Sequence, residues 1–170
     1  IDKDAMLKGS RLHRKLQKQM GGDYRAEVAL RMNYSYEDLD IRLEGRADGI
    51  FTEDEVVWID EIKGIYGNVE QLEEPVKVHK AQAMCYGYIY GVQEGLSKIG
   101  IQMTYANLET EVVKRFREVI SIEELKECTR NFWMNIINGS VIRKNGRKRE
   151  IILFRAWNFH FPTEKVRERW

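Results

Sequence analysis

The sequence predicts an α/β fold with a central mixed sheet flanked by helices. Three observations support this. Two stretches of β-forming residues flank an acidic turn at residues 52–55, as in a strand hairpin. The second of these stretches has apolar side chains on both of its faces, as in a sheet that helices cover on both sides. Helix-like segments precede and follow this hairpin.

Composition limits the class of protein. The 170 residues, 43% hydrophobic and 32% charged, suit one globular domain with a sizeable core. The net charge of +1 means that a nucleic-acid surface must be a local patch. No apolar run approaches the roughly 20 residues that span a bilayer, and no signal-peptide pattern occurs, so we expect a cytoplasmic protein with no membrane partner. Cys85 and Cys128 form no CxxC pair, which argues against disulfide stapling and zinc.

Residues 4–20 are predicted to form a helix that ends at a Gly-Gly pair. Gly9, His13 and Gln17 are spaced four apart and therefore share one face of this helix. On its own, His13 is either an ordinary half-exposed helical histidine or a metal ligand.

A strand is predicted at residues 24–32, with Glu27 embedded in it. Two interpretations of Glu27 stay open. Its carboxylate either contacts a metal ion or water, or pairs with a neighbouring cation such as Arg31 or Arg46. A polar turn is expected at residues 33–40.

The next strand is predicted at residues 39–51 and contains Asp48. An Asp-Gly pair between apolar residues is also a common hairpin turn. The more polar residues 52–55 are the better hairpin tip, however. Asp48 is therefore expected within the strand, opposite the neighbourhood of Glu61.

The following strand, residues 55–63, is the most informative part of the chain. Strand side chains alternate between faces, so Val57, Ile59, Glu61 and Lys63 share one face. A carboxylate and an ammonium at the end of a buried strand are costly unless they hold something. The natural candidate is a hard metal ion together with a phosphate substrate.

A helix is predicted at residues 71–91, with Gln82 and Tyr86 one turn apart on one face. On one interpretation this is an aromatic-rich core helix whose glutamine caps a sheet. Three further elements are expected after it: strands at residues 99–107 and 112–119, and a helix at residues 121–138.

A basic hairpin is predicted at residues 141–154, because Asn145-Gly146 is a strong turn signal. Five cations surround the turn: Arg143, Lys144, Arg147, Lys148 and Arg149. They suit an arm that grips DNA phosphates. They equally suit an edge hairpin that charge protects from aggregation.

Four motifs together resemble a known family. Asp48 followed by Glu61-Ile62-Lys63 resembles the D…(D/E)-X-K signature of the PD-(D/E)XK nuclease superfamily. Three further elements are similar to its RecB-like exonuclease branch: a GxxxH helix at residues 9–13, a GxxDg strand at residues 45–49 and a QxxxY helix at residues 82–86. The set covers roughly residues 5–106 in the family's order.

The resemblance implies a restriction-endonuclease-like core of the order αβββαβ, followed by the C-terminal helix and the basic hairpin. It also implies a metal-dependent deoxyribonuclease, an exonuclease of DNA repair or recombination. Asp48, Glu61 and the carbonyl of Ile62 would bind Mg²⁺ or Mn²⁺, with His13 completing the site and Glu27 as a second-tier ligand. Oxygen ligands suit Mg²⁺, and an added imidazole shifts the preference toward Mn²⁺.

The resemblance also assigns roles around the metal. Lys63 would orient the attacking water or stabilise the transition state. Gln82 and Tyr86 would steady this lysine or contact the DNA backbone. Some relatives carry a four-cysteine iron–sulfur cluster, which two cysteines cannot supply, so no such cluster is expected.

The tail, residues 159–170, is similar to the F-P-x-x-x-x-R segment that opens XPD/DinG-like DNA helicases. Together with Ile rather than Met at position 1, this predicts a nuclease domain of residues 1–158 fused to a helicase domain in the same polypeptide. No P-loop motif occurs, so the chain itself is not expected to hydrolyse ATP.

Two other functions stay open. The chain could be a catalytically silent DNA-binding module of a larger helicase that keeps the nuclease fold. The filled signature positions argue against this, because degenerate relatives usually lose the Asp or the Lys. A restriction- or transposase-like endonuclease is the third possibility, and no specificity segment supports it.

Overall fold

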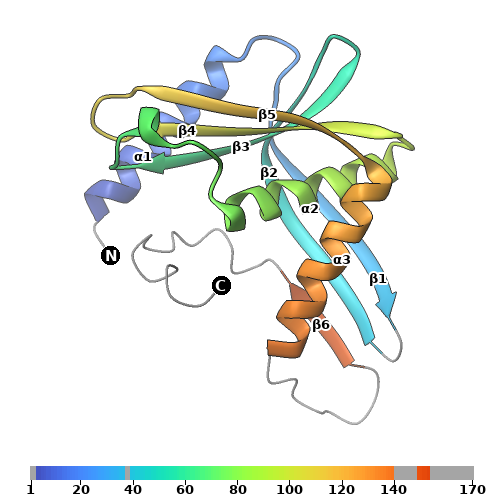
Figure 1. Cartoon of the computed structure of the whole chain (residues 1–170). Coiled ribbons are helices and arrows are strands. Elements are labelled where there is room, and N and C mark those ends of the chain that lie inside the picture. Colours follow the sequence, from blue (N-terminus) through green and yellow to red (C-terminus); the bar gives the residue numbers. More distant parts are fainter. Residues whose placement is uncertain (1–2, 37–38, 140–148, 154–170) are drawn as a thin grey trace. The chain divides into compact units, whose positions relative to one another are not determined.

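The computed structural model describes residues 3–36, 39–139 and 149–153 (Figure 1). The chain divides into two compact units. The first comprises Ile1–Leu30 with Arg46–Ile142, and the second comprises Arg31–Gly45 with Arg143–Trp170. The residues predicted to bind metal belong to the first unit.

The expected α/β class is confirmed. The described elements are, in chain order, α1 (Lys3–Gln19), β1 (Arg25–Tyr36), β2 (Leu39–Glu53), β3 (Val56–Ile65), the 3₁₀ helix η1 (Val69–Gln71), α2 (Lys77–Gln93), β4 (Lys98–Asn107), β5 (Val113–Ser121), α3 (Ile122–Gly139) and β6 (Arg149–Leu153). Helix α3 begins where Ser121 Oγ accepts a hydrogen bond from the backbone N–H of Glu124, 3.2 Å away.

The sheet has the strand order β1-β2-β3-β4-β5. Strands β2 and β3 are antiparallel, β3 and β4 are parallel, and β4 and β5 are antiparallel. The parallel pair requires a crossover, which α2 provides. The β2–β3 hairpin turns at Asp54 and Glu55, which both have positive φ, 51° and 60°. A two-residue turn of this kind matches the twist of the strands that it joins, and it lies within the predicted tip.

Helices cover both faces of the sheet in the first unit, with α1 on one face and α2 and α3 on the other (Figure 1). Leu12 and Leu16 of α1 are buried in a cluster with Ile62 and Ala106. On the opposite face, a Cβ added at Gly87 would lie only 2.7 Å from a methyl of Ile101, so glycine lets α2 approach β4 closely. These contacts fix α1 and α2 against β3 and β4.

Two predicted boundaries are wrong. Helix α2 begins at Lys77 instead of residue 71, because Pro75 disfavours a helical conformation in the residue before it. The turn expected at residues 33–40 is shorter, because β1 continues to Tyr36 and β2 starts at Leu39. Tyr34 and Tyr36 recur at alternate positions and are strong strand formers, which extends β1.

In the second unit, β6 pairs in parallel with β2, from Leu39 opposite Arg149 to Leu43 opposite Leu153. The predicted basic hairpin falls mostly outside the described residues, as do its turn and the tail at residues 159–170. Among the helices of the described ranges, none is long and apolar enough to cross a bilayer.

Candidate functional site

The candidate site lies where β2 separates from β3. Their backbone pairing ends at Gly49 opposite Asp60, one residue after Asp48. Beyond this point a side chain joins the two strands: Oδ2 of Asp48 accepts a hydrogen bond from the backbone N–H of Ile62, 2.6 Å away. Oδ1 lies 3.2 Å from Nε2 of His13 on α1. The carboxylate is thus anchored to β3 by one oxygen and presents the other to α1.

Gln17, near the end of α1, bonds both β1 and β2 at the candidate site. Its Nε2 lies 2.8 Å from the backbone carbonyl oxygen of Asp48 and 2.9 Å from Oε1 of Glu27, and it donates to both. Gln17 is buried, although glutamine is usually exposed. The sequence places Gln17 on the face of His13, but its two acceptors come from strands that only the fold brings together.

Glu27 is directed toward the site by an unusual backbone. It has φ of 56° within β1, a left-handed conformation that non-glycine residues rarely adopt. Such a residue interrupts the strict alternation of a strand and re-aims its side chain. Oε2 pairs with Nε of Arg46 at 2.7 Å, one of the two pairings considered for it. Ligand atoms of His13, Glu27 and Asp48 also lie within 4.8 Å of one another.

A series of hydrogen bonds runs from Glu61 and Lys63 on β3 to Gln82 and Tyr86 on α2. Lys63 Nζ lies 2.7 Å from Oε1 of Glu61 and 3.0 Å from Oε1 of Gln82. Nε2 of Gln82 donates to the hydroxyl of Tyr86 at 3.1 Å. Glu61, Gln82 and Tyr86 are buried, whereas the Lys63 side chain is 22% exposed. The ammonium is therefore held from two sides and still reaches solvent.

Burial and neighbouring carboxylates shift the pKa values of two groups in the site. Burial raises the pKa of Glu61 to about 8, the Asp48 carboxylate adds to this, and Lys63 opposes it. For His13, burial alone would lower the pKa, but the carboxylates of Asp48, Glu27 and Glu61 outweigh burial and raise it. Both groups therefore lie in the field of the Asp48 carboxylate.

Two buried polar atoms without an aligned hydrogen bond lie among the predicted metal ligands. Within the described part of the chain, His13 Nε2 and Glu61 Oε2 are buried and make no aligned hydrogen bond. His13 Nε2 still lies 3.2 Å from Oδ1 of Asp48, whereas Glu61 Oε2 has no partner in the described residues. Leaving a buried oxygen unsatisfied is costly, so a bound cation would stabilise it. One imidazole and several carboxylate oxygens are donors that suit Mn²⁺ or Mg²⁺. Glu61 lies outside the 4.8 Å grouping of ligand atoms, which contains Glu27 instead.

A second polar cluster, on the opposite face of β3, was missed by the sequence reasoning. Asp60 is buried and accepts hydrogen bonds from Tyr24 (2.7 Å), Thr104 (2.7 Å) and Gln102 (3.0 Å). A side chain at Gly49 would overlap the Tyr24 ring, so glycine lets this tyrosine reach across β2. Strand alternation alone places Asp60 on the face opposite Glu61. The hydrogen bonds of this cluster hold β3 in place at Asp60, the residue directly before Glu61.

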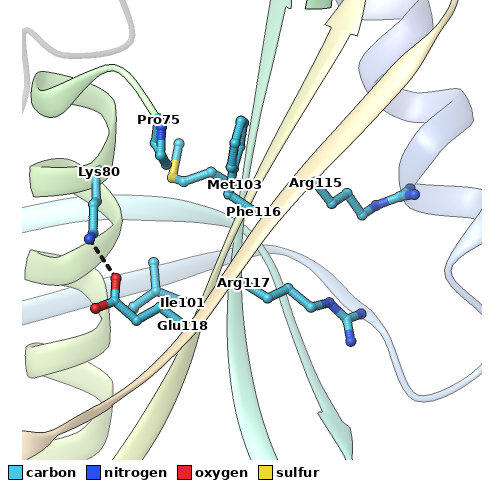
Figure 2. A pocket seen from close by; sticks show the side chains of 8 residues that line it. All are labelled: Pro75, Lys80, Ile101, Met103, Arg115, Phe116, Arg117 and Glu118. Atoms are coloured by element: carbon cyan, nitrogen blue, oxygen red, sulfur yellow. Dashed lines mark ion pairs between the residues drawn. The ribbon is translucent and has the colours of Figure 1, made fainter. Parts of the chain in front are cut away.

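A separate hollow of about 400 Å³ lies next to β5 (Figure 2). Its lining residues are Pro75, Lys80, Ile101, Met103, Arg115, Phe116, Arg117 and Glu118. Lys80 and Glu118 form an ion pair across it, and the side chains of Arg115 and Arg117 extend away from this pair (Figure 2). None of the predicted catalytic or metal-binding residues lines this hollow.

Of the five cations predicted to grip DNA, Arg143, Lys144, Arg147 and Lys148 lie outside the described residues, and Arg149 is the first residue of β6. Their role stays a prediction.

No protein-family model and no curated protein matches the chain. Among solved structures, the chain is similar to the crystal structure of SSO0001, with a TM-score of 0.59 and 19% sequence identity. The match covers 84% of this chain and 64% of that chain. At this identity the likeness shows a shared fold alone.

Proposed function

We propose that the chain is a metal-dependent deoxyribonuclease of the RecB-like PD-(D/E)XK type, acting as an exonuclease in DNA repair or recombination. The observation that carries the proposal is the cluster of His13, Asp48 and Glu27 beside the buried carboxylate of Glu61. The positions that resemble the family's four motifs are far apart in the sequence. Hydrogen bonds and ion pairs link them within one site.

The ligands for a divalent ion would be Asp48, Glu61, His13 and the carbonyl of Ile62, with Glu27 able to approach from β1. The ion would supply a water of lowered pKa and would offset negative charge on the phosphate. Asp48 is already held by the backbone of Ile62, so the site is preorganised.

Lys63 is the group best placed to act on the substrate. Its ammonium is partly exposed and is oriented by Glu61 and Gln82, and Tyr86 in turn holds the amide of Gln82. A fixed cation at this place can orient the attacking water and stabilise the negative charge that develops on the phosphate. Protonated Lys63 has no lone pair to offer a metal, so its contribution is electrostatic.

Degradation of DNA tests the proposal. Purified protein is incubated with end-labelled linear or circular single-stranded DNA and with Mg²⁺, Mn²⁺ or EDTA. We expect the linear DNA to be degraded with either metal and to survive in EDTA, and the circle to survive throughout. Cleavage of the circle would make the protein an endonuclease. No cleavage of any DNA with any divalent ion would favour a silent DNA-binding module.

Fusion to a helicase domain in the same polypeptide remains part of the proposal. It rests on the similarity of residues 159–170 to the helicase segment, and those residues lie outside the described part of the chain.

A further inference from the structure

Helix α1 concentrates positive charge. Of its 17 residues, six are Lys or Arg and one is acidic, while the whole chain has a net charge of only +1. Five of these cations form what we call the basic face of α1: Lys8, Arg11, Arg14, Lys15 and Lys18. All five are exposed. Their spacing of three and four residues places them on adjoining turns of one side of the helix.

The basic face lies beside the candidate site without being part of it. The same helix buries Leu12 and Leu16 against the sheet and presents His13 and Gln17 to Asp48. These residues lie on other sides of the helix from the five cations. A DNA strand whose phosphate would be held by a metal ion at Asp48 therefore has the basic face within reach.

Most of these cations are available to bind a phosphate. Lys15 pairs with Glu111, and the Arg14 guanidinium bonds Ser10 of its own helix. Lys8, Arg11 and Lys18 have no ion pair with any residue in the described ranges. Like charges along one helix repel one another, so this arrangement carries a cost that a polyanion relieves.

A hollow lies between the basic face and Gln17. It has a volume of about 330 Å³, near the lower end of the range for ligand pockets. It is lined by Arg14, Gln17, Lys18, Gly21, Tyr24 and Ala26. Gln17 is the residue that bonds both Asp48 and Glu27, so the hollow adjoins the cluster of His13, Glu27 and Asp48. Two cations flank it, and Tyr24 adds an aromatic surface against which a base can pack.

We propose that the basic face of α1 holds the phosphates of the DNA strand on one side of the bond that is cleaved. This inference rests on the proposed nuclease function and adds to it a path for the substrate. The contacts are made to the phosphate backbone, so binding is independent of base sequence and strongly dependent on salt.

The test compares two variants with equal losses of charge. One is Arg11→Gln/Arg14→Gln/Lys18→Gln on the basic face. The control, Lys98→Gln/Lys126→Gln/Arg130→Gln, removes exposed cations at the start of β4 and on α3, which covers the sheet face opposite α1. Glutamine is a good helix former, so α1 should persist.

Binding of a fluorescent single-stranded oligonucleotide is measured by anisotropy in EDTA at several salt concentrations. For the basic-face variant we expect an affinity at least about tenfold lower at low salt. The slope of log affinity against log salt should be shallower by about 2, since each lost phosphate contact removes about 0.7. The control should match wild type. Equal slopes for wild type and the basic-face variant would overturn the inference, as would equal losses in both variants.

Steady-state cleavage kinetics distinguish failure of the basic-face inference from failure of the proposed nuclease function. In the basic-face variant, KM for long DNA should rise about tenfold or more, with kcat within about twofold of wild type. A fall in kcat at unchanged KM would instead mean that the replacements disturb His13, and it would overturn the inference. If wild type cleaves DNA and the variant cleaves it identically, the proposed function stands and the inference fails. If wild type neither binds nor cleaves DNA, both fail.

Discussion

Lys63→Ala should abolish metal-dependent cleavage, with a loss of about two or more orders of magnitude, as for other preorganised electrostatic donors. Lys63 contacts Glu61 and Gln82 but is not a ligand of the proposed metal ion. An interaction made only in the transition state lowers turnover with little change in affinity. Single-turnover cleavage measures the loss, and anisotropy in EDTA should give DNA affinity close to wild type.

The Lys63 experiment is run at saturating metal, because Lys63 opposes the raised pKa of Glu61 and its removal weakens this carboxylate as a ligand. Lys98→Ala removes an exposed lysine from β4 and is the matched control. Equal cleavage by wild type and Lys63→Ala would show that the active site lies elsewhere.

Asp48→Asn is expected to remove divalent metal binding and with it cleavage, again by about two orders of magnitude or more. An amide lacks the charge of a carboxylate, which is the main attraction for a hard cation. Its oxygen can still accept the hydrogen bond from the N–H of Ile62, so the strand geometry should persist. Calorimetric titration with Mn²⁺ measures binding, and thermal unfolding without metal checks the fold.

The outcome for Asp48→Asn distinguishes a ligand from a structural residue. If the variant unfolds in the absence of metal, the Asp48 carboxylate serves mainly to join β2 to β3. Retained Mn²⁺ affinity in a folded variant would also contradict our assignment.

Local pattern was sufficient for several features. Strand alternation put Glu61 and Lys63 on one face, and helical spacing put Gln82 beside Tyr86. The structure links these side chains by hydrogen bonds. The acidic tip of the β2–β3 hairpin was also predicted, because polar turn residues between two strands are a strong local signal.

Contacts between distant parts of the chain were predicted only where the family resemblance supplied them, as for His13 with Asp48 and Lys63 with Gln82. The two acceptors of Gln17 come from β1 and β2. The donors to Asp60 are Tyr24, just before β1, and Gln102 and Thr104 of β4. No local pattern encodes such pairs. The positive φ of Glu27 is a strained conformation that tertiary structure imposes. The sequence therefore left open whether Glu27 contacts a metal ion or pairs with a cation, and the structure places it near His13 and Asp48.

The central claim is that His13, Asp48 and their neighbours hold a divalent ion. An anomalous difference map from Mn²⁺-soaked crystals tests it most directly. We predict a peak bonded to Nε2 of His13 and Oδ1 of Asp48, about 2.0 to 2.3 Å from each. Carboxylate oxygens of Glu61 or Glu27 should complete the coordination. A peak at another place, or no peak in crystals soaked at saturating Mn²⁺, would contradict the account.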